Sequence, residues 1–355
     1  MKIKVMVVDD SALIRSMLTE VINSQPDMMV IATAPDPLIA RELIKAHNPD
    51  VLTLDVEMPK MDGLDFLGRL MRLRPMPVVM ISTLTKRGSE VTLKALELGA
   101  VDVVAKPQLT PGTSLDGYAD VITDKIRSAA QSKIKVLAAH AEPKPYPVKQ
   151  TSDTAQIASR HFNGSQLIAV GASTGGTVAL KTFLMSMPEN SPGIVITQHM
   201  PAGFTKTFAE RLNSTCKMDV VEAVGGEPIV SGKVFIAPGG RHLLIGKRAS
   251  QFVTVVNDDP VHNRHKPSVD LLFDSVARLA GNQAIGVIMT GMGKDGASGL
   301  LSMKRAGAFT IAQNEDSCVV YGMPKEAVSI GAVDISLPIE AIASAVLERA
   351  GKTPN

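Results

Sequence analysis

The sequence predicts an α/β protein of two domains. An N-terminal five-stranded doubly wound domain precedes a C-terminal doubly wound, mostly parallel α/β domain that carries a β-hairpin. Three observations favour this fold class. Short apolar runs alternate with amphipathic segments in both halves, a proline-rich segment without periodicity separates them, and 355 residues suffice for about two domains.

The first half contains five apolar runs that are rich in β-branched residues and lack strict alternation, which is typical of strands buried on both faces. These runs are Lys4–Val8, Met29–Thr33, Val51–Leu54, Val78–Ile81 and Val101–Ala105. Apolar residues at helical spacing follow the first run, with Ser11 as a candidate N-cap. A second helical pattern, Glu90–Leu98, ends at Gly99. We expect this domain to span residues 1–125.

A linker is predicted at residues 126–162, where Pro143, Pro145 and Pro147 precede a polar stretch without period. Alternation of strands and helices resumes in residues 163–352, the second predicted domain. Its predicted strands are Leu167–Val170, Ile194–Thr197, Val220–Ala223, Val234–Ala237, Ala284–Thr290 and Phe309–Ala312. The pattern within His242–Val256 predicts a β-hairpin inserted among them.

Composition excludes several classes of function. Lys plus Arg number 37 and Asp plus Glu number 35, so a net charge of +2 argues against binding to nucleic acid or to an anionic membrane surface. No apolar run is long enough to span a bilayer, and no signal peptide begins the sequence. Two distant cysteines suit a reducing compartment. We therefore expect a cytoplasmic protein without direct membrane insertion.

Polar residues follow the predicted strands of the first half. Asp9 and Asp10 end the first strand, Asp55 the third, Ser82 the fourth, and Lys106 follows the fifth. Because parallel strands end at one sheet edge, we expect these side chains to gather there. Three carboxylates would repel one another without a hard cation, so the cluster indicates an Mg²⁺ site at which a phosphoryl group is transferred. The alternative interpretation is that the aspartates cap a helix and Lys106 is a surface charge.

Residues 1–125 resemble the receiver domain of two-component response regulators. The resemblance implies that Asp55 is the phosphoacceptor, and that Asp9, Asp10, Asp55 and the carbonyl of Glu57 bind Mg²⁺. It also implies that Ser82 contacts the phosphoryl group and that Lys106 neutralises it. Many receivers carry an aromatic switch residue three positions before the lysine. Val103 stands there in this sequence, so an aromatic-rotation mechanism is not expected.

A G-x-S-x-G motif in the second half indicates a nucleophile. The strand at Leu167–Val170 runs into residues 171–176, Gly-Ala-Ser-Thr-Gly-Gly, and a helical pattern follows. This places Ser173 at a helix N-terminus, where backbone amides favour a developing anion. A phosphate-binding loop is the alternative, although the motif lacks a P-loop lysine.

The carboxyl ends of two further predicted strands carry a candidate base and a candidate carboxylate that would orient it. His199 follows the strand Ile194–Thr197, and Asp295 lies in the glycine-rich turn after Ala284–Thr290. We predict a Ser173–His199–Asp295 triad. A lone histidine in this position is usually structural, and Asp295 could instead cap the helix Ala297–Arg305. His262 and His265 have H-x-x-H spacing, which we interpret as a groove or structural segment, with a metal site as the alternative.

Residues 163–350 resemble the catalytic domain of chemotaxis protein-glutamate methylesterases. The resemblance rests on five motifs, GASTGG at 171–176, QHMP at 198–201, APGG at 237–240, HKPSVD at 265–270 and TGMGKDG at 290–296. It implies a phosphorylation-activated hydrolase of glutamate γ-methyl esters, which forms an acyl-enzyme on Ser173 and also has the chemistry to deamidate glutamines. Backbone amides of Thr174 and Met292 would hold the oxyanion.

The implied partners are the methylated cytoplasmic helices of chemoreceptors and, as phosphodonor, the histidine kinase of the chemotaxis pathway. No cofactor is expected for the esterase reaction. Two further hypotheses are a response regulator with a DNA-binding output and a receiver that only sequesters partners. The near-neutral charge, the βα pattern and the lack of a helix-turn-helix motif argue against the DNA-binding output.

Overall fold

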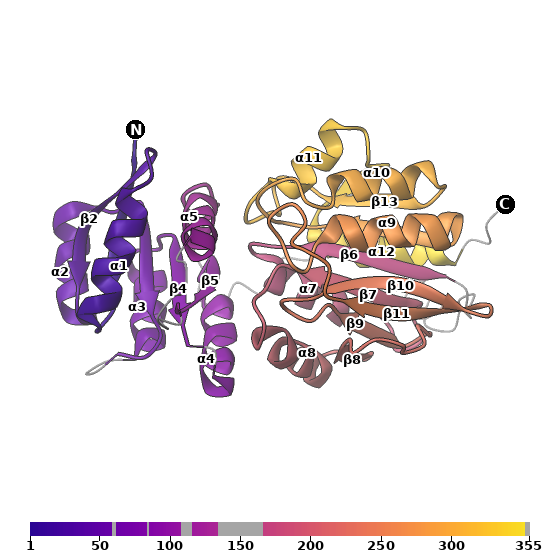
Figure 1. Cartoon of the computed structure of the whole chain (residues 1–355), viewed down its shortest axis with the longest axis horizontal. Coiled ribbons are helices and arrows are strands. Elements are labelled where there is room, and N and C mark those ends of the chain that lie inside the picture. The colour runs from indigo at the N-terminus through magenta and orange to yellow at the C-terminus, as the bar shows by residue number, and fades with distance from the viewer. Residues whose placement is uncertain (59–61, 84, 108–115, 134–165, 352–355) are drawn as a thin grey trace. The chain divides into compact units, whose positions relative to one another are not determined.

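The computed structural model describes residues 1–58, 62–83, 85–107, 116–133 and 166–351. The chain divides into two compact units, Met1–Glu142 and Pro143–Asn355, which are described separately below (Figure 1). The last helix of the first unit, α5, spans Asp116–Ala130, so it continues five residues beyond the domain boundary expected at residue 125. Most of the linker predicted at residues 126–162 lies outside the described residues.

The first unit is a five-stranded parallel sheet in the order β2-β1-β3-β4-β5, which confirms the predicted fold class. Its strands are β1 (Ile3–Val8), β2 (Met28–Ala34), β3 (Val51–Asp55), β4 (Val78–Ser82) and β5 (Asp102–Ala105). The helices between and after them are α1 (Ala12–Asn23), α2 (Pro37–His47), α3 (Gly63–Leu73), α4 (Lys86–Glu97) and α5. Every residue of β3 and β4 is buried, as the continuous apolar runs predict.

The strand order of this unit reverses between β1 and β3, and ligands of open α/β sheets bind at such a point. The loop after β1 is held by Ser11, which caps α1 by accepting a hydrogen bond from the backbone N–H of Ile14. This confirms the predicted cap. Because β1 and β3 pair in parallel, their carboxyl ends lie side by side, with Asp9 just beyond β1 and Asp55 at the end of β3.

The second unit contains a seven-stranded sheet whose strand pairs are all parallel, in the order β14-β13-β12-β6-β7-β9-β8. Its strands are β6 (Leu167–Ala172), β7 (Gly193–Gln198), β8 (Asp219–Glu222), β9 (Lys233–Ile236), β12 (Ala284–Ile288), β13 (Phe309–Gln313) and β14 (Ile335–Leu337). The predicted hairpin forms a separate two-stranded antiparallel sheet of β10 (His242–Arg248) and β11 (Gln251–Asn257). Strand β14 was not predicted, because its three residues are too few to show a pattern.

Helices pack around this sheet, and its core is made of the strands' apolar residues and the inner faces of the helices. The helices are α7 (Gly176–Met185), α8 (Phe204–Thr215), α9 (Val269–Leu279), α10 (Ala297–Arg305), α11 (Met323–Ser329), α12 (Ile339–Ala350) and a 3₁₀ turn, Gly281–Gln283. The first strand of the unit, β6, lies between β12 and β7, so the strand order reverses there. The carboxyl ends of these three strands form the edge where a ligand is expected.

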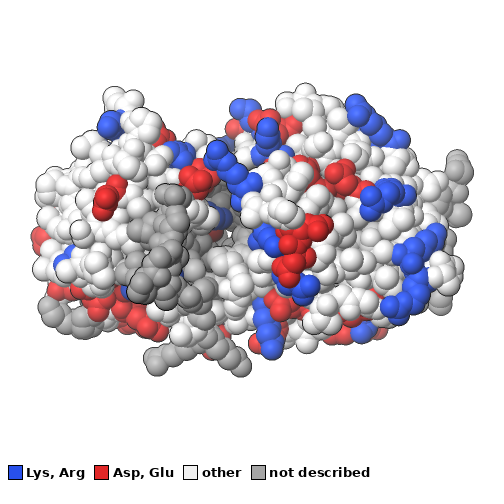
Figure 2. Space-filling view, in the orientation of Figure 1, with Lys and Arg blue, Asp and Glu red and all other residues white. Residues whose placement is uncertain are grey.

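Acidic and basic side chains are interspersed on the face of the molecule drawn in Figure 2, in keeping with the near-neutral net charge. Within the described residues, no helix combines the length and the apolar character that crossing a bilayer requires.

Candidate active site and acidic cluster

Ser173 lies directly after β6, in the tight turn that leads into α7. Its backbone N–H donates to the carbonyl of Thr290, 3.0 Å away, which ties the turn to the end of β12. The turn closes through Gly175, whose φ of 77° is a left-handed conformation that L side chains rarely adopt. Only 5% of Ser173 is exposed. The sequence motif thus places a nearly buried hydroxyl at the strand–helix junction.

A glycine allows the end of β12 to approach this serine. A Cβ added to Gly291 would lie 2.7 Å from the Cβ of Ser173, which is closer than real side chains come. The neighbouring strand contributes Gln198, whose side-chain amide donates to the carbonyl of Ser173 at 3.0 Å. The serine turn is therefore held from both adjacent strands.

His199 and Asp295 form a buried pair at the same edge. The Nε2 atom of His199 lies 2.8 Å from Oδ2 of Asp295, and the two side chains are 5% and 1% exposed. Because a carboxylate only accepts hydrogen bonds, Nε2 carries the proton of this bond and Nδ1 is left as the basic nitrogen. That Nδ1 is buried and has no hydrogen-bond partner within the described residues.

The backbone places His199 beside the serine turn, since its N–H donates to the carbonyl of Ala172, 3.0 Å away. Within the part of the chain that the structure describes, no hydrogen bond joins the hydroxyl of Ser173 to His199. Such catalytic contacts are often long before substrate binds.

Asp295 accepts hydrogen bonds from the start of α9 as well as from His199. Its oxygens take the backbone N–H groups of Val269 at 2.7 Å and of Asp270 at 3.2 Å, and the hydroxyl of Ser268 at 2.8 Å. Burial by itself raises the pKa of Asp295, but the bond from His199 and these donors outweigh it and hold the pKa well below its usual value. Asp295 is therefore a stable anion at the N-terminus of α9.

A second buried carboxylate, at the start of α9, accepts a hydrogen bond from the start of α10. Asp270, in the first turn of α9, accepts the backbone N–H of Gly299 in the first turn of α10 at 2.7 Å. Asp295 in turn precedes α10 and caps α9, so each helix start is capped by the carboxylate next to the other. The alternative hypothesis that Asp295 caps α10 is wrong, because Gly296 occupies that N-cap position. Burial, and then the charge of Asp295, raises the pKa of Asp270 to about 6.

The two histidines of the H-x-x-H pattern lie in a tight turn over this pair. His262 and His265 exchange backbone hydrogen bonds of 3.1 and 2.8 Å, and the His265 ring stacks on His199 with a centroid separation of 3.7 Å. Neither belongs to a group of residues that could hold a metal within the described residues. Their position supports the interpretation as a structural segment.

The predicted oxyanion residues both border Ser173. Thr174 is buried between Ser173 and Gly175, and its carbonyl accepts the hydroxyl of Thr290 at 2.9 Å. Met292 is half-buried and follows Gly291, the glycine that contacts Ser173.

The acidic residues of the first unit form a cluster at the β1–β3 switch point. Asp9, Asp10 and Asp55 each place a carboxylate oxygen within 4.8 Å of the others, and they are the group of described residues that could hold a metal ion. Lys106 lies 2.8 Å from Asp55 and 3.1 Å from Asp9. Burial, and then the charge of Asp9, raises the pKa of Asp55 to about 6 against the opposing effect of Lys106.

The donor set fits Mg²⁺, a hard cation that prefers oxygen ligands. Asp9 and Asp55 are 1% exposed, and one ammonium group balances only one of the three carboxylates. Within the described residues, the Oδ2 atom of Asp9 faces the Lys106 ammonium at 3.1 Å and has no partner that meets hydrogen-bond geometry.

Within the described residues, the side chains of Glu57 and Ser82 form no hydrogen bond with Asp55. Glu57 is exposed and donates its backbone N–H to Asp55 at 3.4 Å. Ser82 is buried and its hydroxyl donates to the carbonyl of Gly88 at 3.3 Å. Val103 is buried in β5, so the position of the usual aromatic switch is filled by an aliphatic side chain.

Comparisons with known proteins show the family of both units. The family model described as CheB methylesterase matches residues 168–346, and the one described as response regulator receiver domain matches residues 5–112. The chain belongs to the CheB methylesterase family. Its relatives include the protein-glutamate methylesterase/protein-glutamine glutaminase of Methylobacillus flagellatus, 59% identical over 94% of this chain and 93% of that protein. The protein of the same name from Thiobacillus denitrificans is 56% identical over 98% of this chain and 97% of that protein.

A solved structure supports the assignment of the second unit. The crystal structure of the Thermotoga maritima CheB methylesterase catalytic domain is 38% identical, with a TM-score of 0.51, and covers 52% of this chain and 98% of that domain.

In this CheB family member, two residues around the His199–Asp295 pair were not found from the sequence, Asn263 and Asp270. The roles of Asn263 and Asp270 follow from contacts across the fold, although Asp270 ends the HKPSVD motif. In the receiver unit, the buried hydroxyl of Tyr118 in α5 has no hydrogen-bond partner within the described residues. Burial, and then the charge of Asp9, raises the pKa of Tyr118.

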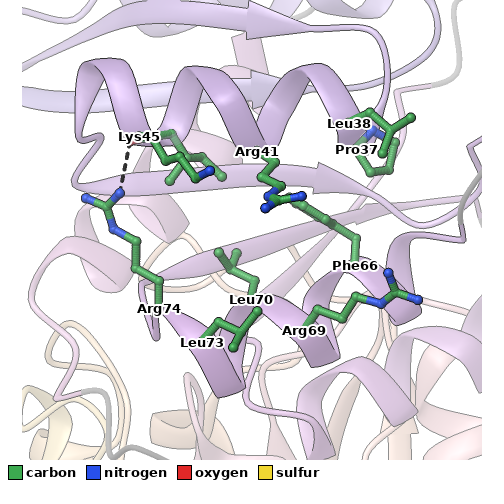
Figure 3. A pocket seen from close by; sticks show the side chains of 10 residues that line it. Pro37, Leu38, Arg41, Lys45, Phe66, Arg69, Leu70, Leu73 and Arg74 are labelled. Atoms are coloured by element: carbon green, nitrogen blue, oxygen red, sulfur yellow. Dashed lines mark hydrogen bonds between the residues drawn. The ribbon is translucent and has the colours of Figure 1, made fainter.

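A pocket of about 450 Å³ lies between α2 and α3 of the receiver unit (Figure 3). Its lining includes the apolar side chains of Phe66 and Leu70 and the basic side chains of Arg41, Lys45 and Arg69. None of these residues belongs to the acidic cluster, so the pocket is separate from that cluster.

Proposed function

We propose that this chain hydrolyses glutamate γ-methyl esters on the cytoplasmic helices of chemoreceptors and releases methanol, with the receiver domain at residues 1–125 regulating a catalytic domain at 163–352. The observation that carries the proposal is the buried His199–Asp295 pair beside Ser173, at the switch point of a CheB methylesterase fold. The names of the relatives support the choice of substrate.

Ser173 acts as the nucleophile. Nδ1 of His199 takes the proton from its hydroxyl as the oxygen attacks the ester carbonyl, and backbone amides of Thr174 and Met292 stabilise the oxyanion. The ester C–O bond then breaks and His199 returns the proton to the departing methoxide. Water repeats the sequence on the acyl-enzyme, which yields the glutamate carboxylic acid and free serine. Asp295 keeps the proton on Nε2 and stabilises the imidazolium.

The same steps applied to a glutamine side chain release ammonia. The second half of the relatives' name, protein-glutamine glutaminase, favours this additional activity.

Phosphorylation of Asp55 is the proposed regulatory input, with the histidine kinase of the chemotaxis pathway as phosphodonor. Asp9, Asp10, Asp55 and the carbonyl of Glu57 would hold Mg²⁺, which supplies charge neutralisation for phosphoryl transfer when bound. Lys106 pairs with Asp55 and would contact the phosphoryl group, together with Ser82.

Replacement of the nucleophile tests the proposal. Ser173→Ala is expected to lower kcat by about 10⁴-fold or more in an assay of methanol released from a receptor cytoplasmic fragment carrying radiolabelled methyl esters. Labelling by a serine-directed fluorophosphonate should disappear in parallel. Ser186→Ala, which removes an exposed hydroxyl at the other end of α7, is the matched control. Full turnover by the Ser173→Ala protein would exclude the mechanism.

A further inference from the structure

Within the described residues, the imidazole of His199 makes a single hydrogen bond. Nε2 of His199 is bonded to Asp295, whereas Nδ1 has no hydrogen-bond partner within the described residues. One hydrogen bond at a ring atom fixes that atom but leaves the plane of the ring free to tilt. The proton transfer to Nδ1 nevertheless requires its lone pair to point at the serine, so another group must set the plane.

His265 lies flat against His199. The ring centroids are 3.7 Å apart and the planes differ by 13°. Parallel rings present their faces to each other, so this contact is a stacking contact that restricts tilt of the catalytic imidazole. It also places a π-face against the ring that becomes positively charged during the reaction.

The turn that carries His265 is itself anchored to the catalytic carboxylate. His262 and His265 close a two-residue turn through Asn263 and Arg264, whose φ values of 50° and 65° are both left-handed. The side-chain amide of Asn263 donates to Asp270 at 2.6 Å and to Asp295 at 3.3 Å. One short turn therefore contacts both members of the pair, Asp295 through Asn263 and His199 through His265.

The backbone of this turn is costly to form. Left-handed conformations are unfavourable at residues other than glycine unless the residue is of a type, such as asparagine, that tolerates them. Arg264 has no such tolerance, so the surrounding contacts must favour the turn. Strain of this kind concentrates at sites where it orients a functional group.

We propose that His265 is a positioning residue, which sets the plane of the His199 imidazole by stacking and thereby aims Nδ1 at Ser173. This inference deepens the proposed function and rests on it. The role requires a flat ring at position 265. It requires neither the nitrogen atoms of His265 nor its charge.

The test compares two replacements of similar bulk, His265→Phe and His265→Leu, of which only phenylalanine is flat. His265→Leu is expected to lower kcat about tenfold with KM changed less than twofold, because the substrate still binds but the base is misdirected. His265→Phe should retain kcat within about threefold of the unchanged protein. His262→Phe, a substitution of the exposed histidine of the same turn, is the control and should match the unchanged protein.

A spectroscopic measurement separates this inference from the proposed function. In protein labelled with ¹⁵N-histidine, the Nε2 proton shared by His199 and Asp295 gives a downfield resonance that needs no substrate. It is expected to persist in His265→Phe and to broaden or shift in His265→Leu, at equal urea unfolding midpoints.

Equal kcat and equal spectra for the Phe and Leu variants would overturn the positioning role. Equal losses in both would overturn it too, since they would show that the imidazole nitrogens matter and not the flat ring. Absence of esterase activity in the unchanged protein would instead refute the proposed function, and the resonance would still report on the stacking.

Discussion

Asp295 has two roles at the scale of a single residue. It fixes the imidazole of His199, and it accepts two backbone N–H groups and one hydroxyl at the start of α9. A side chain with both sets of contacts connects the proposed reaction to the stability of the fold. Ser173 differs, because its hydroxyl makes no hydrogen bond within the described residues that would be lost on replacement.

Asp295→Ala is therefore expected to abolish turnover and also to destabilise the catalytic unit by about 3–5 kcal/mol, because the donors around it lose their acceptor. Urea unfolding of the full chain, followed by circular dichroism, measures the second effect. Ser173→Ala is the reference and should change the free energy of unfolding by less than about 0.5 kcal/mol. Equal unfolding midpoints for the two variants would contradict the capping role of Asp295.

At the scale of elements, α9 and α10 begin next to each other and exchange carboxylate caps. Asp270 accepts the N–H of Gly299 in α10, and Asp295 accepts the N–H groups of α9. Both carboxylates are buried, and the negative charge of each makes ionisation of the other less favourable. Of the two, Asp295 has the lowered pKa and Asp270 the raised one, so Asp270 takes up a proton first as the pH falls.

The raised pKa of Asp270 predicts an unusual pH dependence. An unfolded aspartate titrates near 3.8 and this one near 6, so between these values the folded state binds more protons than the unfolded state. Its contribution therefore lowers the stability of the catalytic unit as the pH rises from 4 to 6.5, by up to about 3 kcal/mol.

Asp270→Asn keeps the size and the acceptor oxygen but removes this titration. The difference in unfolding free energy between Asp270→Asn and the unchanged protein should move in favour of the variant by up to about 3 kcal/mol between pH 4 and pH 6.5. Urea titrations at the two pH values decide the matter. If the difference in unfolding free energy between the two proteins is equal at pH 4 and pH 6.5, Asp270 does not titrate between these pH values.

All strands of the two parallel sheets except β14, and the residues at their ends, could be predicted from sequence because buried parallel strands form continuous apolar runs and strand ends meet at one edge. That reasoning placed Ser173, His199 and Asp295 at one sheet edge, where the structure has the His199–Asp295 pair. It could not find Asn263 or the stacking of His265, because these depend on how a turn far along the chain folds over the sheet edge. The short strand β14 also escaped, since it pairs with β13 over only three residues.

At the scale of the whole molecule, two units with separate chemistry are joined in one chain. The acidic cluster belongs to the first unit and the Ser173–His199–Asp295 site to the second. A regulatory role of the receiver requires that the phosphorylation state of Asp55 change the population of active arrangements.

Asp55→Asn removes the phosphoacceptor charge, so a small-molecule phosphodonor with Mg²⁺ should no longer raise the esterase rate. The unchanged protein should respond, and residues 150–355 alone should be more active than the unphosphorylated full chain. Phosphate incorporation and methanol release are measured on the same samples. An Asp55→Asn protein that incorporates phosphate at the original rate would show that another residue is the acceptor.

The exchange of caps between α9 and α10 also bears on how this enzyme can degenerate over evolutionary time. A duplicated copy released from selection for catalysis can lose Ser173 at little structural cost, whereas loss of Asp295 exposes it to misfolding and proteolysis. Catalytically dead descendants of such a gene are therefore expected to keep the aspartate long after the serine has gone. A retained aspartate is then a poor indicator of retained activity, and the serine is the residue to inspect.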